Sequence, residues 1–154
     1  MSANRGGEVG QLYREHRDRL WRAVFLYAGD REVATDAVAE AFTQALRRGA
    51  GINSILPWVW RAAFRIAAGE LKERRRMASQ IETDAHEAPN ESLFLAEALA
   101  KLSPKQRAAS ILHYYADYSL KETAAVMGST VPAVGMQLSR ARRRLRELLE
   151  ERDG

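Results

Sequence analysis

Apolar residues recur at intervals of three and four positions along most of the chain, which is the spacing of one face of an α-helix. The first set includes one histidine and consists of Leu12, His16, Leu20, Val24 and Tyr27. A glycine often ends a helix, and Asp30 is a residue type that caps the next one. The pattern therefore predicts an amphipathic helix that ends at Gly29 and a second helix directly after it.

Two further helices complete the N-terminal half. The second helix is predicted over 31–48, because its apolar positions again keep helical spacing and Gly49 follows it. These positions are Val33, Ala37, Val38, Ala41, Phe42, Ala45 and Leu46. Ser54 and Pro57 open a third helix, which we expect to run to about Met77.

An acidic stretch follows the third helix. Residues 78–91 contain Glu82, Asp84, Glu87 and Glu91, a Pro-Asn pair and no basic residue. This composition predicts a flexible acidic linker. It separates a helical domain at 8–77 from a second one at 92–151.

The C-terminal half carries explicit start and stop signals for helices. Ser103 to Gln106 and Ser119 to Glu122 are capping boxes, the first with proline at the first helical position. After a helical segment at 92–101, three helices are expected to end at about Tyr115, at Gly128 and at about Glu150, the last one capped by Thr130. No alternating strand pattern occurs, so the predicted fold is all-α.

The last two helices and their tight turn are typical of a helix-turn-helix, whose second helix enters the major groove of DNA. Ala124 is small where the helices cross, and Gly128 permits the turn. Val134 and Leu138 are expected to point back to the first helix. The predicted DNA-reading face on the opposite side consists of Ala133, Met136, Gln137, Arg140, Arg143 and Arg144. The alternative is a solvated basic helix in a four-helix bundle.

The residues of this face differ in the contacts that their side chains can make with DNA. Gln137 and Arg140 can make bidentate contacts to bases, whereas Arg143 and Arg144 are expected to bind phosphates. Gly135 lies inside the predicted helix, where a glycine costs about 1 kcal/mol relative to alanine. It either allows close approach of the DNA backbone or is merely tolerated.

Charge is concentrated in two segments. The 154 residues include 24 basic and 20 acidic ones, a net charge of +4. Residues 61–76 and 140–146 hold eleven of the 24 basic residues and only two acidic ones, which leaves a net charge of −5 on the rest. The small net charge therefore conceals one basic patch in each predicted domain.

The first patch is a stripe on the third helix, whose other sides are apolar. It consists of Arg61, Arg65, Lys72 and Arg76, with Trp58 at its margin and Arg75 in the adjoining run of arginines. Such a stripe suits single-stranded nucleic acid, because phosphates meet arginines and unstacked bases meet the ring. Alternatively, Trp58 and Trp60 are core residues that do not contact nucleic acid, and this interpretation is favoured for Trp60.

Several classes of protein are disfavoured. Without cysteine there is no disulfide, thiol nucleophile or Cys-based zinc site, which fits a cytoplasmic protein stabilised by packing. The first ten residues lack the apolar core of a secretion signal, and no stretch is apolar enough to insert into a membrane. His16, His86 and His113 lie in no metal-binding motif, and no glycine-rich phosphate loop occurs. We therefore expect a protein that is not an enzyme and needs no metal or cofactor.

The chain resembles the extracytoplasmic-function (ECF) family of bacterial RNA polymerase sigma factors, which contain only the region 2 and region 4 domains. In region 2 the resemblance rests on the segment 12–16, on Asp36, Glu40 and Phe42, and on Trp58-Val59. In region 4 it rests on Leu102-Ser103-Pro104, Gln106-Arg107, Glu122, Ala124, Gly128, Val134, Leu138, Arg140 and Ala141. It differs from the family pattern at Ala39, Arg65, Gly69, Ala133 and Gly135.

The resemblance implies a protein that binds core RNA polymerase, directs it to promoters and helps to open the DNA. Asp36, Glu40 and Phe42 would dock on the clamp helices of the largest polymerase subunit. The −10 element would be held and melted by Trp58, Arg61, Arg65, Lys72, Arg75 and Arg76. The −35 element would be read by the helix after Thr130, with Ala133, Met136, Gln137, Arg140, Arg143 and Arg144. An anti-sigma factor is a further implied partner.

Two alternatives remain at this point. One is a helix-turn-helix regulator that acts without polymerase, and the other is a helical interaction or enzyme module that does not bind DNA. Neither needs the acidic second helix or the arrangement of the predicted melting segment, so these two features favour the sigma factor.

Overall fold

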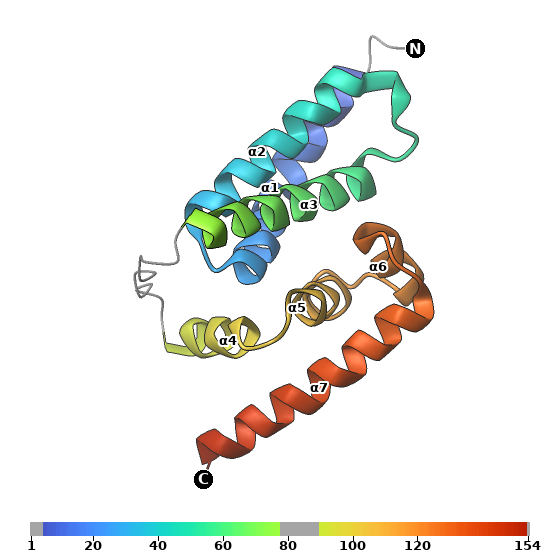
Figure 1. Ribbon diagram of the computed structural model, residues 1–154. Coiled ribbons are helices and arrows are strands. Elements are labelled where there is room, and N and C mark those ends of the chain that lie inside the picture. The colour runs from blue at the N-terminus through green and yellow to red at the C-terminus, as the bar shows by residue number, and fades with distance from the viewer. Residues whose placement is uncertain (1–4, 78–89, 154) are drawn as a thin grey trace. The chain divides into compact units, whose positions relative to one another are not determined.

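The computed structural model describes residues 5–77 and 90–153, and within these ranges it contains helices and no strand. The all-α prediction is therefore confirmed for this part of the chain. Figure 1 shows the order of the elements. They are α1 (Arg5–Ala28), α2 (Arg31–Arg48), the short 3-10 turn η2 (Gly49–Gly51), α3 (Ile55–Met77), α4 (Asn90–Ala100), α5 (Pro104–Ser110), the π-helical turn η3 (Ile111–Tyr115), α6 (Leu120–Met127) and α7 (Val131–Asp153).

The chain divides into two compact units, one up to Glu73 and the other from Arg74 onward. The predicted boundaries at 8–77 and 92–151 stay a prediction, and most of the predicted acidic linker at 78–91 lies outside the described residues.

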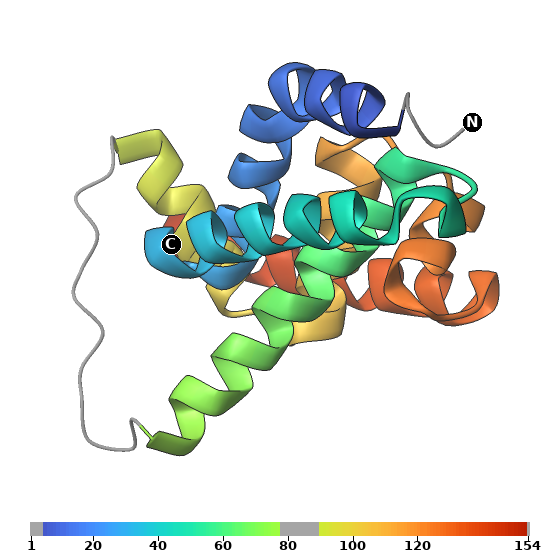
Figure 2. The ribbon, with the colours of Figure 1, turned by 90° about the horizontal axis from the view of Figure 1, so that it is seen from above.

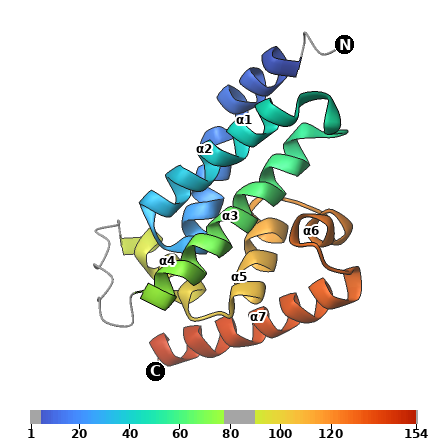
Figure 3. The ribbon, with the colours of Figure 1, turned by 45° about the horizontal axis from the view of Figure 1, so that its top comes forward.

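The first unit consists of α1, α2 and most of α3. Figures 1 and 3 show α2 lying along α1, and Figure 2 shows α3 turning back after the connecting loop and running obliquely to α2. The unit begins earlier than the apolar pattern indicated, because α1 starts at Arg5 and Val9 is already buried. The fully buried side chains include Leu20, Val24, Val33 and Val59. Leu46 is the exception among the expected core positions of α2, since it is 54% exposed.

In the second unit, α4, α5 and α6 pack against the long helix α7 (Figures 1 and 3). Ala124 and Val134 are buried together with Ala109 and Leu138, and Met127 packs against this cluster. The apolar contact expected at the centre of the helix-turn-helix is therefore confirmed.

Hydrogen bonds confirm the predicted starts of α5 and α6 and the predicted end of α6, whereas the helix expected to reach Tyr115 changes to the π-helical turn η3 after Ser110. Ser103 and Ser119 both form complete capping boxes, with Gln106 and Glu122 respectively. Gly128 ends α6 in the left-handed conformation at φ 64°, which an L side chain adopts only at a cost. Gly128 therefore ends α6 where the sequence predicted and allows the turn that leads to α7.

Candidate nucleic-acid interface

The start of α7 is held by its cap. The Thr130 hydroxyl oxygen accepts a hydrogen bond from the backbone N–H of Ala133 at 3.2 Å. Thr130 itself is exposed, as is Val131, which is 41% exposed. The N-terminal end of α7 is thus capped and open to solvent, as a groove-reading helix requires.

Burial around α7 shows which of its sides faces solvent. At 100° per residue, the direction opposite the buried Val134, Leu138 and Ala141 contains the exposed residues Met136 and Arg143. Arg140 is also exposed. The exposed Ser139 lies on the same side and is not among the residues predicted for this face. Its helical spacing from Met136 and Arg143 identifies it in the sequence, although its side chain is short.

Three residues of the predicted reading face lie at its edge. Ala133, Gln137 and Arg144 are only partly exposed, because they are nearer in rotation to the buried side of α7. Arg144 Nη1 also lies 3.3 Å from Glu147 Oε2 and 4.0 Å from Glu151 Oε1. The exposed face is therefore rotated toward Met136 and away from Gln137, relative to the face that the sequence suggested.

The basic stripe of α3 is exposed along its length. Arg61, Arg65, Lys72, Arg75 and Arg76 are all exposed on α3. The apolar arc on the other sides of the helix is buried and includes Val59, Ala63 and Ala67. The helix thus presents its cations to solvent and its apolar residues to the unit, as the spacing predicted.

The two tryptophans of α3 have different surroundings. Trp60 is 2% exposed and stacks on Phe64, with 6.3 Å between the ring centroids, so it is a core residue as favoured from the sequence. Trp58 is partly exposed and lies beneath the guanidinium of Arg48. Only Trp58 therefore has a ring that a nucleotide base can reach.

The residues expected to dock on polymerase differ in exposure. Asp36 is exposed on α2, and Glu40 is partly exposed and accepts a hydrogen bond of 3.1 Å from Gln44 Nε2. Phe42 is only 4% exposed, and its ring meets that of Tyr13 edge to face at a centroid distance of 5.1 Å. In the free protein this ring therefore packs α2 against α1, and its expected part in polymerase docking stays a prediction.

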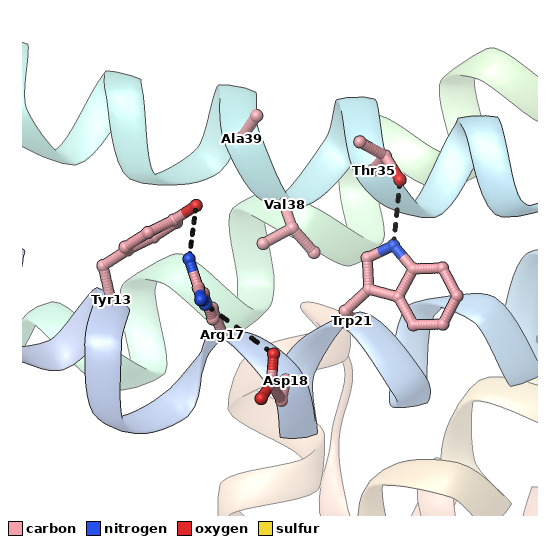
Figure 4. A pocket seen from close by; sticks show the side chains of 7 residues that line it. All are labelled: Tyr13, Arg17, Asp18, Trp21, Thr35, Val38 and Ala39. Carbon is pink, nitrogen blue, oxygen red and sulfur yellow. Dashed lines mark hydrogen bonds and ion pairs between the residues drawn. The ribbon is translucent and has the colours of Figure 1, made fainter.

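A shallow cavity of about 140 Å³ lies between α1 and α2, close to Asp36 in the chain (Figure 4). Its aromatic walls are Tyr13 and Trp21, and Trp21 Nε1 donates a 3.0 Å hydrogen bond to the Thr35 hydroxyl. Arg17 Nη1 donates to the Tyr13 hydroxyl at 3.4 Å, and this bond raises the pKa of Arg17 above its ordinary value. The α1–α2 surface is thus partly apolar, with a permanent cation at its edge.

The described residues contain no cluster of three or more His, Cys, Asp or Glu side chains that could hold a metal. His113 has a structural partner, since its Nδ1 lies 2.7 Å from the Tyr118 carbonyl oxygen. His86 falls outside the described ranges. No helix in the part of the chain that the structure describes is long and apolar enough to cross a membrane.

Comparisons with known proteins agree on one family. Residues 95–145 match the family described as Sigma-70, region 4. The chain is 29% identical to the ECF RNA polymerase sigma factor SigL of Mycobacterium tuberculosis, over 91% of this chain and 88% of SigL. It is 28% identical to the ECF RNA polymerase sigma factor BldN of Streptomyces coelicolor and 35% identical to an RNA polymerase sigma-E factor of Streptomyces antibioticus. These two alignments include 97% and 79% of this chain but only 63% and 62% of the relatives' own lengths.

Solved structures share the fold. CnrH, solved in complex with the cytosolic domain of CnrY, superposes with a TM-score of 0.78 at 23% identity, over 97% of this chain and 92% of CnrH. The sigma factor RpoE of Bartonella quintana, solved with the anti-sigma factor NepR, gives a TM-score of 0.80 at 22% identity, over 93% of this chain and 97% of RpoE.

Proposed function

Because this chain belongs to the ECF family of RNA polymerase sigma factors, we propose that it binds core RNA polymerase and confers promoter specificity on it. In this proposal the first unit acts as region 2 and the second as region 4. The protein acts in the cytoplasm as a binding factor without catalytic chemistry of its own.

The observation that carries the proposal is the difference between the two basic surfaces. One is the exposed side of α7, a single helix in a helix-turn-helix with Arg140 and Arg143, which suits the major groove of a duplex. The other is the stripe of α3 beside the partly exposed ring of Trp58, which suits separated strands. A factor that both recognises duplex DNA and holds melted DNA needs both surfaces.

The −35 contacts are assigned to Thr130, Ala133, Met136, Gln137, Arg140, Arg143 and Arg144, and the −10 contacts to Trp58, Arg61, Arg65, Lys72, Arg75 and Arg76. Exposure supports the strongest roles for Met136, Arg140 and Arg143 in the first set. In the second set every cation is exposed. Salt-dependent binding to phosphates is the expected common property of both.

We propose that α2, with Asp36, Glu40 and the buried Phe42 that packs it against α1, docks on the clamp helices of the largest subunit. The exposure of Asp36 and the partly apolar cavity between α1 and α2 support this assignment. An anti-sigma factor is proposed as a second partner, because two compact units offer it separate surfaces to cover.

The test is transcription in vitro with core RNA polymerase, followed by mapping of the start sites. The protein alone is expected to bind duplex DNA weakly, and with core polymerase it should give discrete run-off transcripts. Tight specific binding to DNA without polymerase, together with no stimulation of transcription, would instead support a helix-turn-helix regulator.

A charge variant connects the test to the docking surface. Asp36→Asn is expected to weaken co-purification with core polymerase and to lower run-off yield at limiting protein. Glu97→Gln, which removes one exposed carboxylate from α4, is the matched control and should behave like the wild type. Equal behaviour of the two variants would contradict the assignment of Asp36.

A further inference from the structure

Arg48 lies over the ring of Trp58, ten positions later in the chain. Its guanidinium carbon is 5.8 Å from the ring centroid. Arg48 is exposed and Trp58 is partly exposed, so solvent reaches both side chains of this pair. Neither the basic stripe nor the family resemblance pointed to Arg48.

The loop between α2 and α3 fixes this pairing. Gly49 has a positive φ of 49° and ends α2, with its N–H donating to the Ala45 carbonyl. Ile52 and Ile55 are 3% and 4% exposed, so their side chains anchor the loop in the core of the first unit. Arg48 is the last residue of α2, and this anchored turn connects it to α3; Figure 3 shows the turn between the two helices.

Arg48 extends the basic stripe beyond α3. Arg61 lies one helical turn after Trp58, and Arg65 follows one turn later. Arg48 thus adds a cation from α2 to those of α3 at the partly exposed ring of Trp58. A planar guanidinium on a ring also occupies the place that a stacked base takes in complexes with single strands.

We propose that Arg48 and Trp58 together bind one unstacked nucleotide of single-stranded DNA. The base stacks on the indole face that Arg48 covers in the free protein, and the guanidinium moves to the phosphate of the same nucleotide. In this rearrangement Arg48 loses its weak, exposed cation–π contact with Trp58, and its guanidinium gains a charge-assisted hydrogen bond to the phosphate. This inference rests on the proposed function and adds a residue of α2 to the surface that holds melted DNA.

The test uses holoenzyme assembled from the full chain and core RNA polymerase. The ligand is a fluorescent single-stranded oligonucleotide with the non-template sequence of the −10 region, taken from a promoter mapped by run-off transcription. Dissociation constants are measured over a range of salt concentrations for the wild type, Arg48→Ala, Arg48→Lys and Trp58→Ala. Arg31→Ala, an exposed arginine at the opposite end of α2, is the matched control.

Loss of one phosphate contact lowers the steepness of the plot of log affinity against log salt by about 0.7, which corresponds to a loss of about five-fold in affinity at 0.1 M salt. We expect this result for Arg48→Ala, whereas Arg48→Lys should keep the salt dependence and Arg31→Ala should match the wild type. In a Trp58→Ala background, Arg48→Ala should have a smaller effect, because both side chains hold the same nucleotide.

If Arg48→Ala keeps both the affinity and the salt dependence of the wild type, Arg48 only shields Trp58 and the inference is wrong. Additive effects of Arg48→Ala and Trp58→Ala would also overturn it, because they would place the two contacts on different nucleotides. Failure of the wild-type protein to support any specific transcription would count against the proposed function instead.

Discussion

Arg142 Nη1 donates a hydrogen bond of 2.8 Å to the hydroxyl oxygen of Tyr114, and this bond joins α7 to the π-helical turn η3. Arg142 stands in the middle of the basic run at 140–146, yet its partner belongs to the same unit. The bond therefore assigns Arg142 to packing within the domain and separates it from the DNA-binding role that Arg140 and Arg143 are expected to have.

Removing this bond should affect stability and leave promoter choice unchanged. We expect Arg142→Ala and Tyr114→Phe each to lower the free energy of unfolding by about 1 kcal/mol. The double variant should lower it by less than the sum of the two single effects, because both substitutions remove the same bond. Chemical denaturation followed by circular dichroism measures this. Arg146→Ala, an exposed arginine of the same helix, is the control. A change in the mapped start sites with Arg142→Ala would show that Arg142 also contacts DNA.

Arg140 and Arg143 should differ in the kind of binding they support. Arg143→Ala is expected to weaken holoenzyme binding to all −35 duplexes alike and to reduce the steepness of its salt dependence by about 0.9, because it removes one phosphate contact. Arg140→Ala should instead change the preference among −35 sequences by about 1–3 kcal/mol at one position. Competition binding with a set of single-base variants distinguishes the two. Uniform weakening by Arg140→Ala would refute its reading role.

The capping box of α6 predicts a dependence of stability on pH. The backbone N–H of Ser119 donates to the Glu122 carboxylate at 2.9 Å and, with the Ser119 side chain, holds the pKa of Glu122 below its ordinary value. Since the pKa is depressed in the folded state, this contribution is complete above the ordinary glutamate pKa of about 4.3 and is lost as the pH falls through the folded value.

Glu122→Gln is the matching variant, because the amide keeps the acceptor oxygen and removes the titration. The difference in unfolding free energy between wild type and Glu122→Gln should be constant from pH 7 to about 5 and should shrink below about pH 4. Urea denaturation at several pH values measures it. A difference that grows as the pH falls would contradict the direction of the shift. Ser119→Ala should cost about 1 kcal/mol at neutral pH through loss of the cap.

The sequence predicted those parts of the fold that local chemistry determines. The capping residues Ser103 and Ser119 bind backbone groups three positions away. Gly128 ends α6 in the left-handed conformation, a requirement of the turn itself that does not depend on what α6 packs against. The buried face of α7 followed from spacing alone, because Val134 and Leu138 lie one turn apart. Such features depend on residues that are close in the sequence, so they can be predicted without knowledge of the tertiary structure.

Features that depend on contacts between distant residues could not be predicted. The spacing of α2 placed Leu46 with the core, but its side chain is 54% exposed in the folded unit. Phe42 belongs to the family's acidic helix motif, and only the edge-to-face contact with Tyr13 reveals that it is buried. The pairing of Arg48 with Trp58 likewise requires the conformation of the loop after Gly49, which the sequence does not specify.

Gly135 provides the last prediction, because the structure offers no internal reason for a glycine at this position. A Cβ atom placed there meets no described atom within 4 Å apart from its chain neighbours and the adjacent backbone of α7, inside which the residue lies. Gly135→Ala should therefore stabilise the second unit by up to about 1 kcal/mol, through the higher helix propensity of alanine. Since nothing in the described chain requires the smaller residue, we expect the requirement to come from close approach of the DNA backbone.

The same substitution should thus raise the unfolding free energy and lower the affinity of the holoenzyme for −35 duplex several-fold. Gly7→Ala is the matched control, because a Cβ at that position of α1 also meets no described atom within 4 Å and lies far along the chain from the helix-turn-helix. Denaturation and duplex binding on the same preparations separate the two effects. Higher stability with unchanged affinity would mean that Gly135 is tolerated in α7 without a role in DNA binding.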